Sequence, residues 1–343
     1  MKRFICIMFI LALAIPAVFA GGNRDKGDGP SGTITIYTSM YEDVIKSVDG
    51  ALKKEFPNCT IEFVYGGTGQ IQAKVAAEQA SGKLGCDILL VAEPSYSFEL
   101  KEKGILHRYI SAETDNLAFD YDKEGYWYPV RISNMVLAYN PARNSKDSIP
   151  NSFSDFANNA SVRGEVSMSN PLTSGTIMAS LCALKDKYGY GYFDALGRQD
   201  VKIESGAAAL AKLETGEYKV VMVLEESVLK KRQEESSRLE VIYPTDGTII
   251  IPSTIMTIAD KKSAHNNTRS AEIITDWFLG PKGQNAIVAG WMHSVRKDFD
   301  KIPYNSISTG DIQANSMPLN WENCFRQKDE IQRRFESSVT NKR

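Results

Sequence analysis

The run at residues 86–92 (CDILLVA) limits the possible folds most, because it is apolar on both faces, as strands buried inside a parallel sheet are. Alternating, β-rich patterns precede it at residues 33–37 and 60–65. Helical spacing of apolar residues over 42–56 and 70–79 separates these three runs. This β-α-β-α-β order predicts an α/β fold with mixed, mostly parallel sheets.

A second long run, at residues 127–140 (WYPVRISNMVLAYN), contains no breaker after Pro129. We expect it to be a strand that crosses from one lobe to another, with residues 249–258 as the strand that returns. A chain of 343 residues is long enough for two such domains. The sequence therefore predicts lobe I from residues 33–133 and 255–343, and lobe II from residues 134–254. Further strand patterns lie at 165–168 and 220–224, and helical patterns at 177–187, 207–213, 271–279, 283–289 and 329–338.

The N-terminal residues have the pattern of a secretory signal peptide. Lys2 and Arg3 precede an apolar stretch at residues 4–18, and residues 17–20 (AVFA) end in a small-x-small pattern. We expect cleavage of residues 1–20, with a retained membrane anchor as the alternative. Residues 21–32 (GGNRDKGDGPSG) then form a flexible tether. The mature protein is expected in the periplasm or another extracytoplasmic compartment.

Charge and cysteine content exclude several classes of function. Lys and Arg number 40 and Asp and Glu 42, so the formal net charge of −2 lacks the basic excess that nucleic acids or anionic membranes require. No cysteines have CxxC or zinc-site spacing, and the three histidines lie far apart. We therefore expect no cofactor and no histidine-rich metal site. Free buried thiols are expected, although an oxidising compartment permits disulfides, at Cys59, Cys86, Cys182 and Cys324.

Polar loops follow several strands and open the next helix, where free backbone N–H groups favour an anion. Helix capping or an ordinary tight turn is the alternative interpretation of each loop. In the first half of the chain these loops contain Ser39, Met40 and Tyr41, and then Thr68, Gly69 and Gln70. In the second half they contain Thr173, Ser174, Gly175 and Thr176, and then Ser205.

Charged side chains lie at the ends of strands in both predicted lobes. Glu93 follows the third strand, and Glu225 and Glu226 follow the strand at 220–224. Carboxylates accept hydrogen bonds from sugar hydroxyls, or bind an amine or a hard cation, although surface acids are as common in such positions. Arg131, in the first crossing strand, is the one cation that we place near the cleft.

The sequence resembles the ferric-binding-protein-like group of periplasmic solute-binding proteins, whose members bind iron, thiamine, phosphonates or hexose phosphates. The resemblance covers nearly the whole mature chain, and the pieces in order are ITIYTSMYED, VYGGTGQIQAKVAAE, CDILLVAEPSYSFELKEKGIL, WYPVRISNMVLAYN, SNPLTSGT, ESGAAALAKLETGEYKVVMVLEES and VIYPTDGTIIIPSTIMTIADKK. It implies a two-lobed type II periplasmic binding protein fold with hinge strands. It also implies a monomeric binding protein, not an enzyme, that delivers a small ligand to the permease and ATPase of an ABC importer.

One departure from the group bears on the ligand. Its iron-binding members use two adjacent tyrosines and a histidine, and the matching positions here are about Glu226-Ser227 and Tyr41, while Glu93 matches the iron-binding glutamate. Because the tyrosine pair is missing, the resemblance is closer to the hexose-phosphate branch. We therefore expect the phosphate group of the ligand to bind the backbone amides at the helix starts, and its hydroxyl groups to bind the carboxylates.

Other functions stay open on the sequence. An aminophosphonate is the nearest substitute ligand, and ferric iron held by Tyr41, Glu93 and Glu226 is the main alternative. An exported hydrolase or transferase on the same fold is a further alternative, although the chain has no GxSxG motif. A surface adhesin is a third possibility.

Overall fold

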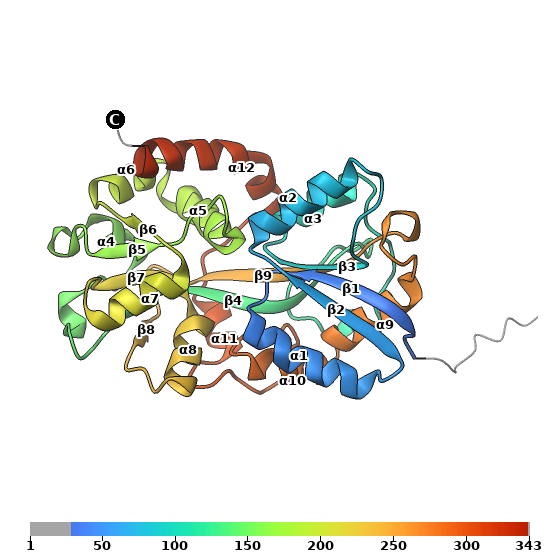
Figure 1. Ribbon diagram of the computed structural model, residues 1–343. Helices are drawn as coiled ribbons and strands as arrows, with labels where there is room; N and C mark the ends of the chain where they lie inside the picture. The colour runs from blue at the N-terminus through green and yellow to red at the C-terminus, as the bar shows by residue number, and fades with distance from the viewer. Residues whose placement is uncertain (1–28, 342–343) are drawn as a thin grey trace, which may run out of the picture.

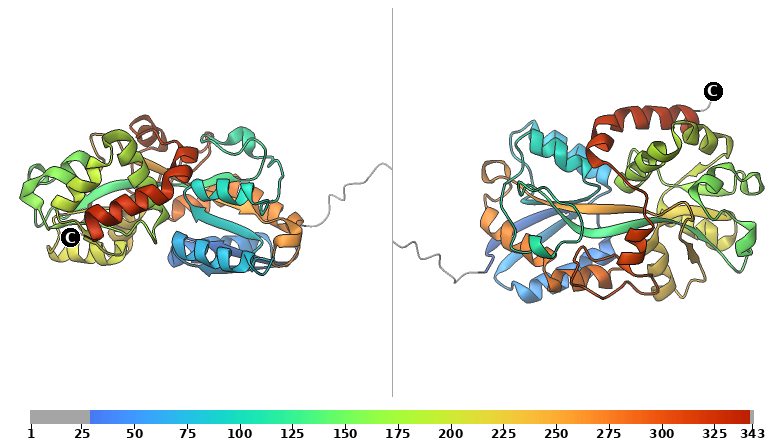
Figure 2. Two further views of the ribbon diagram at one scale, coloured as in Figure 1. Left: turned by 90° about the horizontal axis from the view of Figure 1, so that it is seen from above. Right: turned by 180° about the vertical axis from the view of Figure 1, so that it is seen from behind.

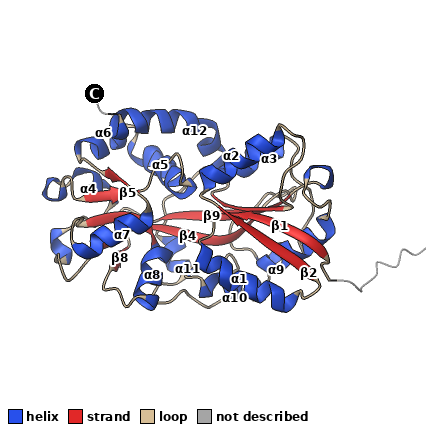
Figure 3. Ribbon diagram, in the orientation of Figure 1, coloured by secondary structure: helices blue, strands red, loops and turns tan. Residues whose placement is uncertain are grey.

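The computed structural model describes residues 29–341, so the predicted signal peptide and most of the predicted tether lie outside the described residues. Two lobes lie side by side, and each has strands covered by helices on both faces (Figures 1 and 3). Among residues 29–341, no helix is long and apolar enough to cross a membrane.

Lobe I begins with the predicted alternation of strands and helices. Strand β1 is parallel to both of its neighbours, β2 and β3. The strands are β1 (Gly32–Thr38), β2 (Cys59–Tyr65) and β3 (Ile88–Ala92). The helices of this lobe are α1 (Glu42–Glu55), α2 (Thr68–Gln79), α3 (Ser95–Glu102), α9 (Thr268–Leu279) and α10 (Pro281–Ala289), with the short turns η1 (Thr114–Asn116) and η4 (Asp260–Lys262).

Lobe II repeats this arrangement, with β5 parallel to both β6 and β7. Its strands are β5 (Val166–Met168), β6 (Lys202–Ile203), β7 (Val220–Leu224) and β8 (Glu240–Ile242). Its helices are α4 (Phe153–Asn158), α5 (Gly175–Tyr188), α6 (Gly191–Arg198), α7 (Gly206–Thr215) and α8 (Glu225–Glu234), with the turns η2 (Lys146–Ser148) and η3 (Ala160–Val162). The C-terminal helices are α11 (Thr309–Ala314), α12 (Trp321–Phe335) and a π-helical turn, η5 (Glu336–Thr340).

Two long strands connect the lobes, as the sequence predicts. Strands β4 (Tyr128–Tyr139) and β9 (Ile249–Thr257) pair antiparallel and run from one lobe into the other (Figure 1). They join the sheet in the order β2-β1-β3-β9-β4-β7-β5-β6, with β8 on β4. Near the middle of the crossing Ile132 pairs with Pro252. Any polar side chain near this midpoint lies between the lobes.

Helix α12 contacts α3 of lobe I but buries its apolar side chains in lobe II, whereas the sequence predicts lobe I for residues 255–343. Met317, Cys324, Ile331 and Phe335 are buried in the hydrophobic cluster of lobe II. Helix α12 lies over α5 and α6 in Figure 1, and Figure 2 shows it reaching the junction of the lobes. The apolar spacing of α12 predicts a helix, but the spacing alone does not say which lobe its apolar face covers.

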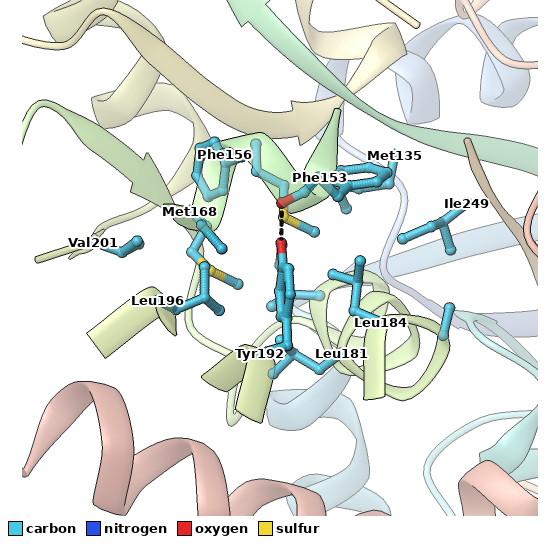
Figure 4. Packing of buried hydrophobic residues seen from close by; sticks show 14 of the residues in the cluster. Met135, Phe153, Phe156, Met168, Leu181, Leu184, Tyr192, Leu196, Val201 and Ile249 are labelled. Carbon is cyan, nitrogen blue, oxygen red and sulfur yellow. Dashed lines mark hydrogen bonds between the residues drawn. The ribbon is translucent and has the colours of Figure 1, made fainter. Parts of the chain in front are cut away.

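The core of lobe II is a packed cluster of aromatic, aliphatic and methionine side chains (Figure 4). At its centre the Tyr192 hydroxyl donates a hydrogen bond to the carbonyl oxygen of Phe153, at 2.8 Å. That bond satisfies the polar end of a buried tyrosine. The four described cysteines are buried and free, as expected.

Candidate ligand-binding cleft

A polar cavity of about 110 Å³, here called the inner cavity, lies between the lobes. From lobe I and the crossing strand it is lined by Ser39, Tyr41, Tyr65, Gly67, Thr68, Ala92 and Arg131. From lobe II it is lined by Thr173, Ser174, Gly175, Thr176, Leu224 and Glu226. Apart from Arg131, which lies within a crossing strand, these residues lie at the ends of strands or in the loops that follow them, where ligands bind in α/β proteins.

Helices α1, α2, α5 and α8 all begin at the inner cavity. The amides of Thr68, Gly175 and Thr176 belong to first helical turns, so they have no acceptor within their own helices. The macrodipole adds partial positive charge at each of these helix ends. The cavity therefore presents donors and positive potential from both lobes.

Hydroxyl groups add further donors to the cavity. The Ser39 hydroxyl accepts a hydrogen bond from the Ala92 amide at 3.0 Å, which leaves its hydrogen to donate. Ser174 caps α5 by accepting from the Ile177 amide at 3.3 Å, and its hydroxyl lies 3.0 Å from that of Thr176. Helix capping and ligand binding are thus compatible at Ser174, because the loop that caps the helix also lines the cavity.

Arg131 supplies the positive charge of the inner cavity. Its side chain is 3% exposed and lies on β4 at the crossing. In the described part of the chain it forms no ion pair; one guanidinium nitrogen contacts the Met292 sulfur, and Nε has no hydrogen-bond partner. Burial lowers the pKa of Arg131 from its ordinary value, and the nearby Glu226 opposes that shift. A buried, unpaired cation is costly unless an anion joins it.

Glu226 is the one predicted carboxylate that lines the inner cavity. It is buried, and the Ser133 hydroxyl donates to it at 2.8 Å. Burial raises the pKa of Glu226, and the charge of Arg131 opposes this effect. Its remaining lone pairs are available to a ligand that carries a hydroxyl or an amine.

Glu225 points away from the inner cavity into a network of buried side chains. It accepts hydrogen bonds from Asn134 at 3.1 Å and from the hydroxyls of Tyr243 and Ser306, and it lies 3.2 Å from His293 Nε2. Although burial alone would raise the pKa of Glu225, these hydrogen bonds and the attraction of His293 lower it overall. The carboxylate is fully occupied within the protein, so we assign it to the fold and not to the ligand.

Glu93 also lies outside the inner cavity. Its backbone has a positive φ of 68°, and its carboxylate accepts from the Ser95 amide at 2.8 Å and from the Ser95 hydroxyl. Burial raises the pKa of Glu93 to about 7. It faces a separate small space beside Leu172 and Lys328. None of the cavities described is lined by all three of the alternative iron ligands, Tyr41, Glu93 and Glu226.

Four other predicted site residues have local structural roles. Met40 is buried in the core of lobe I. The Gly69 amide donates to the Thr173 carbonyl oxygen at 3.3 Å, and the Gln70 side chain accepts from the Gly67 amide at 2.9 Å. Ser205 is exposed and caps α7 by accepting from the Ala208 amide. No group of three or more His, Cys, Asp or Glu side chains within residues 29–341 could hold a metal ion.

Four residues that line the inner cavity were not predicted from the sequence: Tyr65, Gly67, Ala92 and Leu224. Tyr65, Ala92 and Leu224 are the last residues of β2, β3 and β7. The rule that ligands bind at the carboxyl ends of strands would have found these three.

The lobes are closed around the inner cavity. On one side Lys230 forms an ion pair with Asp43, and Trp291 Nε1 donates to Gln233 at 2.7 Å. On the other side Lys328 donates to Gln72 at 2.9 Å. Each of these contacts joins a residue of lobe I to a residue of lobe II or of α12.

Comparison with known proteins agrees with this fold. AfuA from Actinobacillus pleuropneumoniae, with exogenous fructose-6-phosphate bound, superposes with a TM-score of 0.79 at 18% identity, covering 91% of this chain and 100% of that one. Iron-bound HitA from Pseudomonas aeruginosa superposes with a TM-score of 0.77 at 18% identity, covering 89% of this chain and 99% of that one. The ferric binding protein from Campylobacter jejuni gives 0.71 at 16% identity, over 88% and 98%. These likenesses confirm the predicted type II periplasmic binding protein fold.

The sequence comparisons identify the family. No curated protein sequence matches the chain. The family model for bacterial extracellular solute-binding proteins matches residues 86–307, which include both crossing strands and most of the inner cavity. The chain therefore belongs to the bacterial extracellular solute-binding proteins, the family that captures small solutes for ABC importers.

Proposed function

We propose that this protein captures an organic phosphate, such as a sugar phosphate, in the inner cavity and delivers it to an ABC importer. Arg131 is the observation that carries the proposal, because it is a buried guanidinium without an ion-pair partner within residues 29–341, and it lines the cavity. First-turn amides from α2 and α5 approach the same cavity from opposite lobes. Together they suit a phosphate group, which accepts several hydrogen bonds and carries negative charge.

Glu226 supports an organic phosphate over inorganic phosphate. A carboxylate in the same cavity as Arg131 repels a bare dianion but accepts a hydrogen bond from a hydroxyl or amine of a larger ligand. AfuA, whose structure has fructose-6-phosphate bound, has the same fold. An aminophosphonate would satisfy the same groups, with its amine on Glu226.

Ferric iron is the second candidate, because iron-bound HitA also has this fold. The residues of the cleft support a ferric iron ligand less well than an organic phosphate. Glu93 does not line the cavity that Tyr41 and Glu226 share, and a tyrosine pair of the kind expected in iron-binding members is missing. A buried arginine beside the ligand also favours an anion over a trivalent cation.

The arrangement around His293 supports binding over hydrolysis. Ser306 and Glu225 both contact Nε2 of His293, while its Nδ1 lies near the Thr309 hydroxyl. A catalytic triad needs the serine and the acid on opposite ring nitrogens. We further propose that the protein acts as a monomer and that residues 1–20 are removed on export.

A thermal-shift comparison tests the proposed function. Chain lacking residues 1–20, refolded to strip bound ligand, is mixed with glucose 6-phosphate, aminoethylphosphonate or ferric citrate. A ligand present at 100 times its Kd adds about 2.7 kcal/mol to the free energy of unfolding and raises the midpoint. We expect a shift with a phosphorylated ligand and none with ferric citrate. A shift with ferric citrate alone would contradict the proposal.

A further inference from the structure

A second cavity, here called the outer cavity, adjoins the inner cavity. It has a volume of about 150 Å³ and shares Tyr41 and Glu226 with the inner cavity. Its other walls include Val44 of α1, Leu210 of α7 and Trp291. The two cavities thus adjoin at Tyr41 and Glu226, so the part of a ligand that extends beyond the phosphate is placed towards the outer cavity.

The cations that border the outer cavity are already neutralised. Lys230 pairs with Asp43, and Lys231 pairs with Glu214 at 3.0 Å and with Glu235 at 2.6 Å. A second anionic group would therefore find no unpaired lysine there. Tyr41, Glu226, Ser227 and Glu235 are the other polar residues of the wall, and its apolar part is formed by Val44, Leu210, Trp291 and the small residues Ala207 and Gly290.

Trp291 is held firmly in this wall. Its indole Nε1 donates to Gln233 across the lobe junction, at 2.7 Å. Its backbone φ is +63°, a conformation that costs a non-glycine residue free energy and persists only where the surroundings impose it. The side chain is 8% exposed. A rigid indole in a small apolar space is a surface against which a flat ring packs well.

Size and polarity together select the ligand. An enclosed protein cavity of roughly 150 Å³ lined by apolar side chains binds benzene, and the outer cavity has about this volume, with apolar side chains on one part of its wall. A hexose carries hydroxyls around its whole ring, and those that face Val44, Leu210 and Trp291 would lose their hydrogen bonds to water without replacement. A planar ring with few polar groups loses far fewer hydrogen bonds to water.

We infer that the solute is a phosphomonoester with a planar, largely apolar ring. This inference rests on the proposed function. The phosphate lies beside Arg131 in the inner cavity, the ring lies in the outer cavity against Trp291, and a donor group on the ring or its linker bonds to Glu226.

Isothermal titration with three phosphomonoesters tests the inference. The probes are phenyl phosphate, methyl phosphate and glucose 6-phosphate, each titrated into refolded chain lacking residues 1–20. We expect phenyl phosphate to bind at least about 10-fold more tightly than either of the others, because only its ring fills apolar space.

Two variants assign the ring to the outer cavity. Ala207→Phe fills the cavity from the exposed start of α7 and should weaken phenyl phosphate at least about 10-fold, with methyl phosphate unchanged. Ala208→Phe is the matched control, because Ala208 is the next exposed alanine of α7 and does not line the cavity, and it should change neither. Trp291→Ala should weaken phenyl phosphate in the same way.

The outcomes separate this inference from the proposed function. If glucose 6-phosphate binds as tightly as phenyl phosphate and Ala207→Phe leaves both unchanged, the ring inference is wrong while the organophosphate function stands. If none of the three phosphomonoesters binds, the proposed function is wrong and the ring inference with it.

Discussion

Adjacent glutamates at the start of α8 have different tasks because their surroundings differ. Glu225 is bonded on all sides by Asn134, Tyr243, Ser306 and His293. Glu226 has one donor, Ser133, and faces the inner cavity. Both are buried and both follow the same strand, so position in the sequence does not distinguish them. Their hydrogen-bond partners distinguish the two glutamates.

Replacing each glutamate by glutamine separates the two roles. Glu226→Gln should weaken ligand binding about 10-fold or more, since a hydrogen bond to a charged group contributes about 1.5–3 kcal/mol, with little change in stability. Glu225→Gln should lower the free energy of unfolding by about 1–3 kcal/mol, because it disturbs a buried charged network. The free energy of unfolding in urea and the ligand affinity by titration are measured for both variants. Equal binding loss in both would contradict the assignment.

Glu93 makes stability depend on pH. Its pKa is about 7 in the folded protein, against 4.5 when unfolded. Well below pH 4.5 the carboxyl is protonated in both the folded and the unfolded state, so it does not reduce the free energy of unfolding. As the pH rises towards 7, the unfolded state loses its proton first, and the folded state loses up to about 3 kcal/mol of stability relative to it.

Glu93→Gln should remove this loss. Free energies of unfolding in urea at pH 5 and pH 8 give the measurement: the variant should gain clearly more stability over the unmodified protein at pH 8 than at pH 5. Glu102→Gln, at an exposed position of the neighbouring α3, is the control and should behave like the unmodified protein. An unchanged difference between the two pH values in Glu93→Gln would refute the prediction.

At the level of whole elements, two glycines let the lobes approach. A Cβ at Gly69 of α2 would lie 2.5 Å from the Leu172 carbonyl oxygen of lobe II. A Cβ at Gly175 of α5 would lie 2.8 Å from the Thr68 side chain of lobe I. Both distances are too short for real contacts, so a side chain at either position would hold α2 and the start of α5 apart.

Gly69→Ala should therefore weaken ligand binding by about 10-fold or more without destabilising the fold. Alanine is favoured over glycine in a helix by about 1 kcal/mol, which offsets part of any local strain. Gly50→Ala in α1 is the matched control, because a Cβ there meets nothing within 4 Å. Titration calorimetry and thermal unfolding of both variants make the comparison. Undiminished affinity in Gly69→Ala would show that close approach of α2 is dispensable.

Elements with strong periodicity could be predicted from the sequence, and others could not. The strand at 220–224 and both crossing strands match their patterns closely. Helix α8 was missed because its sequence, EESVLKKRQE, has few apolar residues and follows a strand without a break. Helix α12 begins at Trp321, eight residues before the predicted start at 329, and the helical spacing of Trp321, Cys324 and Phe325 already indicated the earlier start.

Only part of the candidate site could be predicted from the sequence, because long-range packing brings some of its residues together. The polar loops pointed to Thr68, Ser174 and Glu226, because local sequence marks strand ends and helix starts. Trp291 lies far along the chain from every one of these loops and carries no local signal of a cleft. Only the crossing of β4 and β9 brings its segment beside α8.

At the scale of the whole molecule, the ligand is expected to favour the closed state. The inner cavity takes Thr68 from lobe I, Arg131 from a crossing strand and Ser174 from lobe II. A phosphate can contact all three only when the lobes are closed, so it binds that state selectively. Without a bound anion, only the nearby Glu226 offsets the buried charge of Arg131, which favours opening about the crossing strands.

Small-angle X-ray scattering measures this closure. A compact chain of this length has a radius of gyration of about 20 Å. Ligand-free protein should give a larger value, and a saturating phosphorylated ligand should reduce it towards the compact value. Gly69→Ala should show a smaller reduction. Identical scattering curves with and without a bound ligand would mean that closure does not accompany binding.

The most direct test of an anion site built on Arg131 is the affinity of Arg131→Met for the phosphomonoester that binds best. We predict a loss of about 30-fold or more, since removing one partner of a buried charge pair costs about 2–5 kcal/mol of binding, together with unchanged or improved stability of the ligand-free protein. Arg296→Met is the control, because Arg296 is paired with Glu113 and Asp298 away from the cleft, and it should lose stability but keep affinity. Undiminished binding of the phosphomonoester by Arg131→Met would contradict the account.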